Sequence, residues 1–411
     1  MGLFIFFLTM KNIILFDSEV RQHLLPLTFT RPVAELRIGI TTIKEKWEQL
    51  LDGVASHITE DYLSTKFPIS ISDDNYVIDG SVIPTEALCS RIADLGYNEA
   101  LVKNGELIAA RLGEEQFERV ILEGEMSSLE ETEIDLEFVQ ISRPWHLFSY
   151  NDQVLRADFQ WITKNRKSQT ISPTNQVLGK ENIFLEEGAK VECSILNATT
   201  GPIYIGKNAE IMEGCIVRGA LALCEGATLK MGAKLYGANT FGPHCKVGGE
   251  VGNSILLGYS NKGHDGYLGN SVLGEWCNLG ADTNTSNLKN TYDEVRLWSY
   301  VEKKFAHTGQ NFLGLIMGDH SKSGINTMFN TGTVVGVAAN IFGEGYPRNI
   351  IPSFSWGGYS GFITHKLDKA IATAKIVMAR RNINLTEEDE KILKHLYEIS
   401  TPERSWEKKV G

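Results

Sequence analysis

The chain of 411 residues is long enough for two hydrophobic cores, because single cores seldom grow beyond about 250–300 residues. Its formal net charge of −11 excludes a broad basic surface, so we expect neither nucleic acid nor a membrane as a partner. Six cysteines form no CxxC pair and no zinc-like cluster with histidine. We therefore predict no metal site there, and buried thiols in a cytoplasmic, reducing compartment.

The first nine residues, MGLFIFFLT, are apolar but too short to cross a bilayer, and they lack the basic start of a signal peptide. A strand-like run, KNIILFD, follows Met10 directly. We expect residues 1–9 to be a spurious or disordered extension ahead of a natural start at Met10.

Residues 10–143 alternate strand-like runs such as NIILF and YVIDG with helix-like stretches such as ITTIKEKWEQLL. This alternation predicts an α/β domain. Residues 144–167 carry apolar side chains at helical spacing, and the polar stretch 168–178 contains a proline. The span 144–178 is therefore expected to be a linker helix and a domain boundary.

Glycine is concentrated further along the chain, where 25 of the 39 glycines fall between residues 201 and 345. A strict interval of six separates Ile205, Ile211, Val217, Leu223, Leu229, Leu235, Phe241 and Val247. Small residues follow most of these after four positions. Over residues 179–352 this pattern predicts a left-handed parallel β-helix, in which aliphatic side chains fill the axis and small residues make the corners.

The period of six is interrupted between residues 285 and 312, and in the last block of repeats Ser323 is the one polar residue at the six-residue interval. Insertions in solenoids form loops on one face and often build the site. Residues 353–411 lose the period, and 364–398 read as two helices, the second capped by Thr386. We expect this C-terminal part to cap the end of the coil.

Residues 259–290 hold the most specific motif. In the order Lys262, His264, Tyr267, Asn278 and Asn287, the last three intervals are three, eleven and nine residues. This run resembles the acetyltransferase half of the bifunctional N-acetylglucosamine-1-phosphate uridyltransferase/glucosamine-1-phosphate acetyltransferase family. The whole chain is similar to a divergent bacterial branch of that family assigned to sugar nucleotidyl transfer.

The resemblance implies a homotrimeric enzyme that transfers an acetyl group from acetyl-CoA to glucosamine-1-phosphate or a related amino sugar. His264 corresponds to the general base, a role that suits a side chain titrating near neutrality. Substrate binding would fall to Lys246, Lys262, Tyr267, Asn278 and Asn287, and acetyl-CoA binding to Ala281, Asp319 and Thr331.

Two basic positions of the family pattern are altered. Upstream of the histidine, only Lys246 stands near the family's arginine and lysine that hold the sugar phosphate. The lysine expected after the second asparagine is replaced by the insertion, in which Arg296 is a spatial substitute. The acceptor is therefore left open.

The opening ILFDSEVRQHLLPLTFTRPVAEL resembles a degenerate sugar-nucleotidyltransferase start. Arg21, Arg31 and Asp79 correspond to its nucleotidyl-site residues, and Mg²⁺ would be its cofactor if the domain is active. The phosphate-cradling glycines are absent, and carboxylates stand in their place.

Three alternatives stay open. The first is a nucleotidyltransferase for UTP or dTTP whose coil serves mainly for trimerisation. The second is a non-catalytic scaffold, and the third is a metal-dependent hydratase. The last is disfavoured because β-helix carbonic anhydrases need an H-x₄-H pair, which the sequence lacks.

Overall fold

The computed structural model describes residues 10–122 and 129–407, so the expected extension at residues 1–9 lies outside the described residues. The chain forms two compact units. The first takes the chain up to Arg21 together with Arg31–Glu35 and Thr42–Ile141. The second takes Gln22–Thr30, Leu36–Thr41 and the chain from Ser142 onward, so two short N-terminal stretches group with the later sequence.

The first unit is built on a six-stranded sheet in which β1 lies between β4 and β5 and runs parallel to both. Its strands, in sheet order, are β4 (Gly53–Ile58), β1 (Lys11–Phe16), β5 (Asn75–Asp79), β7 (Glu106–Leu112), β6 (Glu99–Lys103) and β8 (Glu130–Glu133). The helices are α2 (Ile43–Leu51), α3 (Asp61–Ser64), α4 (Glu86–Ala93) and α5 (Glu114–Phe117), beside the short α1 (Val20–His23). One face of the sheet buries Ile14 and Val77 against Phe117, which accounts for the apolar runs of its central strands.

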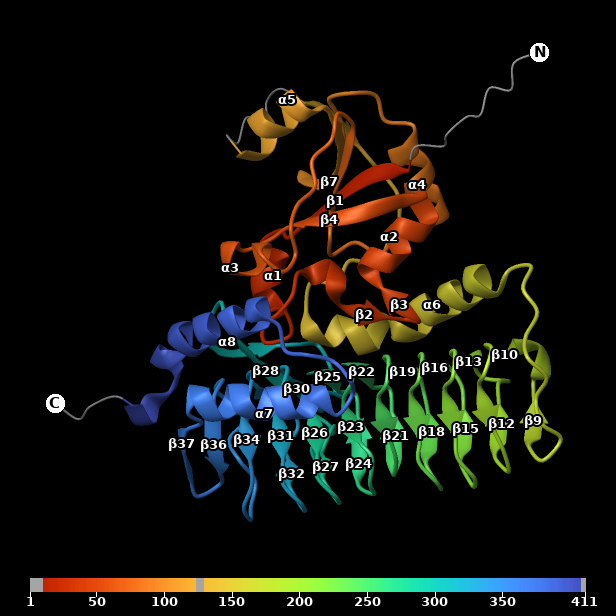
Figure 1. Cartoon of the computed structure of the whole chain (residues 1–411), viewed down its shortest axis with the longest axis vertical. Coiled ribbons are helices and arrows are strands. Elements are labelled where there is room, and N and C mark those ends of the chain that lie inside the picture. The colour runs from red at the N-terminus through yellow and green to blue at the C-terminus, as the bar shows by residue number, and fades with distance from the viewer. Residues whose placement is uncertain (1–9, 123–128, 408–411) are drawn as a thin grey trace. The chain divides into compact units, whose positions relative to one another are not determined.

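The second unit is a parallel β-helix whose rungs stack into flat sheets, as Figure 1 shows. The first sheet holds β10 (Ile183–Leu185), β13 (Ile203–Ile205), β16 (Leu221–Leu223), β19 (Asn239–Phe241), β22 (Ile255–Gly258), β25 (Val272–Glu275), β30 (Leu315–Met317), β33 (Thr333–Val335) and β35 (Ile350–Ile351). The second holds β11 (Lys190–Val191), β14 (Glu210–Ile211), β17 (Thr228–Leu229), β20 (Lys246–Val247), β23 (Asn261–Lys262), β26 (Asn278–Leu279), β31 (Lys322–Ser323), β34 (Asn340–Ile341), β36 (Ser355–Gly358) and β37 (Gly361–Thr364). The third holds β9 (Gln176–Leu178), β12 (Ile195–Asn197), β15 (Ile216–Arg218), β18 (Lys234–Tyr236), β21 (Glu250–Gly252) and β24 (Tyr267–Gly269).

The axis of the coil contains the residues that the period of six selected. All eight of them, from Ile205 to Val247, belong to one buried cluster. The polar exception, Ser323, is also buried, and its hydroxyl lies 2.9 Å from the hydroxyl of Thr283, so the two satisfy each other inside the axis. An α/β unit followed by a parallel β-helix and C-terminal helices confirms the predicted fold class.

One expectation about the cysteines was wrong. Five of the six side chains are buried, but Cys193 is exposed because it occupies a corner of the coil with a positive φ of 50°. A corner residue in this conformation projects away from the axis, whereas Cys215, Cys245 and Cys277 fill the interior. None of the six is disulfide-bonded.

The insertion forms an antiparallel hairpin of β28 (Arg296–Ser299) and β29 (Lys304–His307), preceded by β27 (Asn284–Thr285), which pairs with β32 (Met328–Phe329). Helix α6 (Pro144–Thr163) precedes the coil and contributes to the second unit, where the Asn151 side chain accepts a hydrogen bond from the Gly39 amide at 2.8 Å. Among the described residues, no helix has the length and hydropathy needed to cross a membrane.

The C-terminal helices are α7 (Leu367–Ala379) and α8 (Glu387–Ile399), followed by the 3₁₀ turns η5 (Thr401–Glu403) and η6 (Ser405–Glu407). Thr386 caps α8 in a reciprocal capping box with Asp389. Figure 1 shows α7 lying along the side of the coil rather than across its end, and Arg381, just beyond α7, donates to Asn261 on β23 at 3.1 Å. The last parallel strand, β36, is instead covered by the antiparallel strand β37.

Candidate active site

A pocket of about 470 Å³ opens on the outer face of the second coil sheet. Its floor is a ladder of first residues of successive strands, paired as Lys246 with Asn261, Asn261 with Asn278, and Asn278 with Lys322. The end of α7 forms one wall. The complete lining is Lys230, Lys246, Tyr259, Asn261, Gly263, His264, Trp276, Cys277, Asn278, Leu279, Lys322, Val377, Arg380 and Arg381.

His264 lies in the loop between β23 and β24 and is exposed at the rim of this pocket. Its imidazole makes no hydrogen bond or ion pair with any residue that the structure describes. Both ring nitrogens are therefore available to a ligand, which is what proton transfer requires.

The buried side chain of Lys262 binds the backbone of the protein itself. Its side chain is 2% exposed, and its ammonium donates to the carbonyls of Gly248 at 3.1 Å, His264 at 2.5 Å and Asp265 at 3.2 Å. These bonds use all three donors of the ammonium and fix the backbone of the His264 loop. Burial lowers the pKa of Lys262 to about 8, against the opposing charges of Asp265 and Asp282. The predicted contact of Lys262 with a substrate phosphate stays a prediction.

We predict that Lys262→Met changes how stability depends on pH. Between pH 8 and the ordinary value of 10.5, the unfolded chain holds a proton on Lys262 that the folded chain has released. The free energy of unfolding of the native protein should therefore rise with pH in this window, by up to about 1.4 kcal/mol per pH unit, and the variant should lack that component. Urea unfolding between pH 7.5 and 10 measures the difference, with Lys190→Met on the exposed side of β11 as the control. A constant difference between the two proteins across this range would contradict the prediction.

Positive charge converges on the pocket without a counter-charge. Lys230, Lys246, Arg380 and Arg381 line it, and none of the four forms an ion pair among the residues described. The charge of Arg381 lowers the pKa of Lys246, and partial burial, Lys230 and Arg380 lower it further. Four mutually repelling cations around one cavity favour an anionic ligand, even though the whole chain is acidic.

Asn261 connects the basic wall to the floor. Its Oδ1 accepts the hydrogen bond from Arg381 at 3.1 Å, and its Nδ2 lies 3.4 Å from the Oδ1 of Asn278. The amide of Asn278 is thereby oriented with its oxygen toward Asn261, and no described residue accepts a hydrogen bond from its Nδ2.

An aromatic column stands beside the pocket at one corner of the coil. The rings of His244, Tyr259, Trp276 and His320 stack in sequence, with centroid distances of 5.3, 4.3 and 6.5 Å. All four have positive φ values between 54° and 61°, a conformation that bulky residues rarely adopt. The preceding corner is Gly226, where a Cβ would lie 2.4 Å from the His244 ring, so only glycine leaves room for the first ring. Tyr259 and Trp276 give the pocket a rigid apolar side.

Two predicted substrate residues lie elsewhere. Tyr267 begins β24 in the third sheet, and Asn287 donates to its hydroxyl at 3.0 Å and to the Oδ1 of Asn270 at 2.8 Å. Neither residue lines the pocket. The structure brings His264, Asn278 and Lys246 together and leaves Tyr267 and Asn287 as a separate pair.

The residues predicted for acetyl-CoA are also outside the lining. Asp319 is buried and accepts hydrogen bonds from the Thr30 hydroxyl at 2.8 Å and the Glu275 amide at 2.9 Å. Thr331 is buried, and Ala281 lies half-buried just past β26. Arg296, the suggested substitute for the missing lysine, lies on β28, outside the pocket.

In the first unit, Arg21 is compensated by the chain's own acidic groups. It is 5% exposed, and its guanidinium lies 3.2 Å from Asp17 and 3.3 Å from Glu60, while Nη2 donates to the Tyr62 hydroxyl at 2.8 Å. Arg31 is similarly buried. Nucleotide binding by these arginines stays a prediction, and it would have to compete with these contacts.

Asp79 ends β5, and Asp17 follows β1, so both carboxylates lie at the carboxyl ends of neighbouring parallel strands. This edge is where α/β sheets usually bind ligands. Burial raises the pKa of both groups, although Ser81 donates twice to Asp79 and Thr59 donates to Asp17. The described part of the chain contains no group of three or more His, Cys, Asp or Glu side chains suited to a metal ion. Mg²⁺ usually takes one or two carboxylates and completes its coordination with substrate phosphates and water, so Mg²⁺ as a cofactor of this unit stays a prediction.

Two features of the site were not predicted from the sequence: the wall formed by Lys230, Arg380 and Arg381, and the aromatic corner. A signal existed for the corner, because each of its residues occupies the position that glycine or asparagine takes in earlier rungs, as at Asn208 and Gly226. The arginine pair had none, because it lies more than 110 residues beyond His264 in the sequence and reaches the pocket only through the packing of α7.

Comparison with known proteins finds one family model and several curated relatives that match parts of this chain. Residues 13–167 match the family model described as "Sugar nucleotidyl transferase". The bifunctional sugar-1-phosphate nucleotidylyltransferase/acetyltransferase of Sulfurisphaera tokodaii is 28% identical over 207 residues, covering 50% of this chain and 45% of that protein. The bifunctional protein GlmU of Methanocaldococcus jannaschii is 37% identical over 87 residues, covering 21% of each chain. In these matches the chain spans less than half of the relatives' own length.

Two solved structures are also similar to the chain. The polySia-specific acetyltransferase NeuO has a TM-score of 0.27 at 14% identity and covers 51% of this chain and 99% of its own. LpxA, a UDP-N-acetylglucosamine acyltransferase from Bacteroides fragilis, has a TM-score of 0.26 at 13% identity and covers 55% and 96%.

Proposed function

We propose that this chain, a divergent relative of the bifunctional sugar-1-phosphate nucleotidylyltransferase/acetyltransferases, transfers an acetyl group from acetyl-CoA to the amino group of a sugar phosphate. The observation that carries the proposal is the His264 pocket. There an imidazole and an oriented asparagine amide line one pocket with four cations, and neither the imidazole nor any of these cations forms an ion pair with a residue that the structure describes. A proton acceptor beside an anion-binding wall suits an amine whose molecule carries a phosphate, and a thioester donor that is also negatively charged.

In the proposed reaction, the neutral amine attacks the thioester carbonyl. A carbon–nitrogen bond forms, the carbon–sulfur bond breaks, and His264 takes the proton from nitrogen and passes it to the departing thiolate. The Asn278 amide donates to the oxygen on which negative charge develops. The basic wall holds phosphate, so the part of the substrate that does not react supplies binding energy.

Glucosamine-1-phosphate is the acceptor that we propose first. Of the family's upstream phosphate-binding residues this chain has only Lys246 as a counterpart, and Arg380 and Arg381 supply further positive charge from another part of the chain. The proposed assembly is a homotrimer, which analytical ultracentrifugation would test. With glucosamine-1-phosphate as the acceptor, the proposed reaction belongs to nucleotide-sugar biosynthesis.

A second candidate is nucleotidyl transfer from UTP or dTTP to a sugar-1-phosphate in the first unit. The family-model match over residues 13–167 favours it, and the neutralised state of Arg21 weighs against it. If it operates, Arg21→Ala should abolish pyrophosphate release.

A paired screen on one preparation tests the proposal. We expect CoA release when acetyl-CoA is supplied with glucosamine-1-phosphate, and no release with N-acetylglucosamine-1-phosphate, whose nitrogen is already acylated. Pyrophosphate release from UTP or dTTP with a sugar-1-phosphate and Mg²⁺ is measured alongside. Pyrophosphate release without CoA release from any amino-sugar phosphate would replace the first function by the second.

A further inference from the structure

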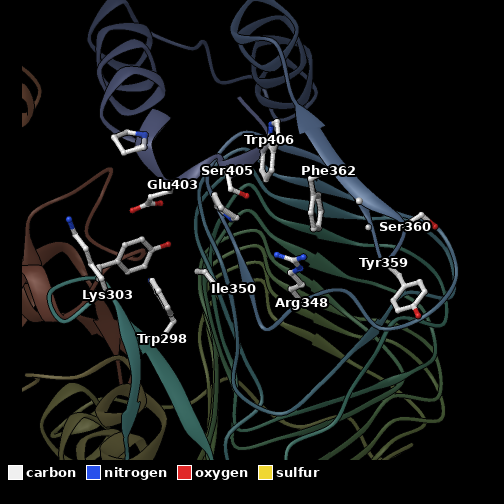
Figure 2. Close-up of a pocket in the computed structure, with 15 residues that line it drawn as sticks. Trp298, Lys303, Arg348, Ile350, Tyr359, Ser360, Phe362, Glu403, Ser405 and Trp406 are labelled. Atoms are coloured by element: carbon white, nitrogen blue, oxygen red, sulfur yellow. The ribbon is translucent and has the colours of Figure 1, made fainter. Parts of the chain in front are cut away.

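A second cavity of about 730 Å³ lies near the C-terminal end of the coil and shares no lining residue with the His264 pocket. Four segments enclose it: the β28–β29 hairpin, the end of the coil, the β36–β37 hairpin, and the turns η5 and η6 (Figure 2). Its volume is within the range of small-molecule sites. The lining is Trp298, Tyr300, Lys303, Arg348, Ile350, Pro352, Gly358, Tyr359, Ser360, Gly361, Phe362, Pro402, Glu403, Ser405 and Trp406.

Several of the lining residues are aromatic. On two sides of the cavity these rings are held in place by packing against another ring. Phe362 packs on Trp406 with a centroid distance of 5.8 Å, and Trp298 packs edge-on against Phe305 at 5.4 Å. Rings held from behind present a fixed apolar surface at little entropic cost to binding. This chemistry suits a flat apolar group.

The hydroxyl of Tyr300 is a polar group in the lining. The oxygen is buried, and no described residue hydrogen-bonds to it. Edge-on packing against Phe29, at a centroid distance of 5.4 Å, fixes the ring on its other side. A buried hydroxyl left unpaired costs about 1–3 kcal/mol, so an acceptor from outside the chain would complete it.

Arg348 contributes a positive charge to the lining. Its guanidinium forms no ion pair among the described residues, and Figure 2 shows it within the ring of lining residues, directed toward Ser405 and Phe362. The acidic side chain in the lining is Glu403, and burial raises the pKa of that carboxyl to about 7, against the charges of Arg404 and Lys303. With Arg348 and Lys303 charged and Glu403 only partly ionised, the cavity is positive at neutral pH.

We propose that this cavity binds a small aromatic anion, with its carboxylate or phosphate on Arg348 and its ring system among Trp298, Phe362 and Trp406. A planar guanidinium pairs with either anion in two parallel hydrogen bonds, and the Tyr300 hydroxyl donates to a further acceptor on the ligand. The site is separate from the acetyl-transfer pocket and does not depend on the function proposed for it.

The test uses the full chain and two fluorescent probes of similar shape. One is 8-anilinonaphthalene-1-sulfonate, an aromatic anion, and the other is the neutral N-phenyl-1-naphthylamine. Arg348→Met should raise the Kd of the anionic probe at least about tenfold and leave that of the neutral probe within about twofold, because a charge-assisted bond contributes about 1.5–3 kcal/mol. Equal loss of both probes, or an unchanged Kd for the anion, would overturn the proposal.

Controls separate this cavity from other basic surfaces. Two variants serve as controls: Arg218→Met, on the exposed side of β15, and Arg381→Met, in the His264 pocket. Both should retain the tight binding of the anionic probe that Arg348→Met removes. Tyr300→Phe should weaken the anionic probe about two- to tenfold and raise the melting temperature without probe, since it deletes the unpaired hydroxyl. A lower melting temperature would contradict the unpaired donor.

Competition identifies the anion. 1-Naphthoate and 1-naphthyl phosphate should each displace the sulfonate probe, and the stronger competitor assigns the natural head group as carboxylate or phosphate. A chain ending at Glu407 should bind the probe as the full chain does. Binding that appears only after this truncation would mean that the chain's own terminal carboxylate occupies the cavity, and would overturn the proposal.

Discussion

Replacing His264 by alanine should lower kcat for acetyl transfer by about 10²–10⁴-fold, the usual contribution of a positioned general base. The imidazole is exposed and unengaged, so its removal breaks no hydrogen bond within the described structure. Folding should therefore be preserved, and KM should stay within about threefold because the basic wall is intact. Steady-state CoA release with glucosamine-1-phosphate measures both constants.

His307→Ala is the matched control. His307 is another exposed histidine of the second unit, but it lies on β29 and pairs with Glu294 at 2.9 Å. Its replacement should leave kcat unchanged. Full activity in His264→Ala would refute the assignment of the base, and equal losses in both variants would point to damage of the coil instead.

The coil was predictable because its constraint is local and repeated. A large side chain at every sixth position fills the axis, and any rung that breaks the rule leaves a cavity or an unpaired polar group. Ser323 illustrates the limit, because its buried hydroxyl is satisfied by groups some forty residues earlier, the Thr283 hydroxyl at 2.9 Å and the Gly280 amide at 3.2 Å. Which residue lies next to a buried hydroxyl in the axis depends on the number of residues between successive rungs.

The site was predictable only in part, and the corner between two sheets explains which part. His264 and Tyr267 are three residues apart, but the loop between them turns from the second sheet to the third, so the two side chains lie on different faces. Asn278 returns to the second sheet one rung later and joins His264. Spacing within a motif fixes rung and face only when the corners between the residues are known.

Lys262 shows a second limit. In the sequence it reads as a cation two positions from the candidate base, and therefore as a phosphate ligand. Its register places it inward, where it pairs with Val247 of the rung before and donates to three carbonyls, so its contact with a phosphate stays a prediction. The alternation of side chains along a strand determines whether a residue points outward or inward. This alternation is visible only once the strand is assigned.

The basic wall should account for most of the substrate affinity. Replacing Arg380 and Arg381 together by methionine should raise KM for the anionic substrate about 10–100-fold and change kcat far less, because charged hydrogen bonds contribute about 1.5–3 kcal/mol each and these residues lie away from the reacting nitrogen. The rise of KM with added salt, expected for the native protein, should become shallower in the variant.

The single variant Arg381→Met gives a readout that does not depend on turnover. Arg381 is the leading cause of the lowered pKa of Lys246, so the pKa of Lys246 should rise in Arg381→Met, as measured by NMR titration of the labelled side chain. Lys369→Met, elsewhere on the exposed surface of α7, is the control and should alter neither KM nor Lys246. A raised pKa with an unchanged KM would show that the cluster exists but does not hold the substrate, and would move the phosphate to another part of the coil. A raised pKa with a raised KM would establish that a helix outside the repeats supplies the anion grip that the repeats themselves lack.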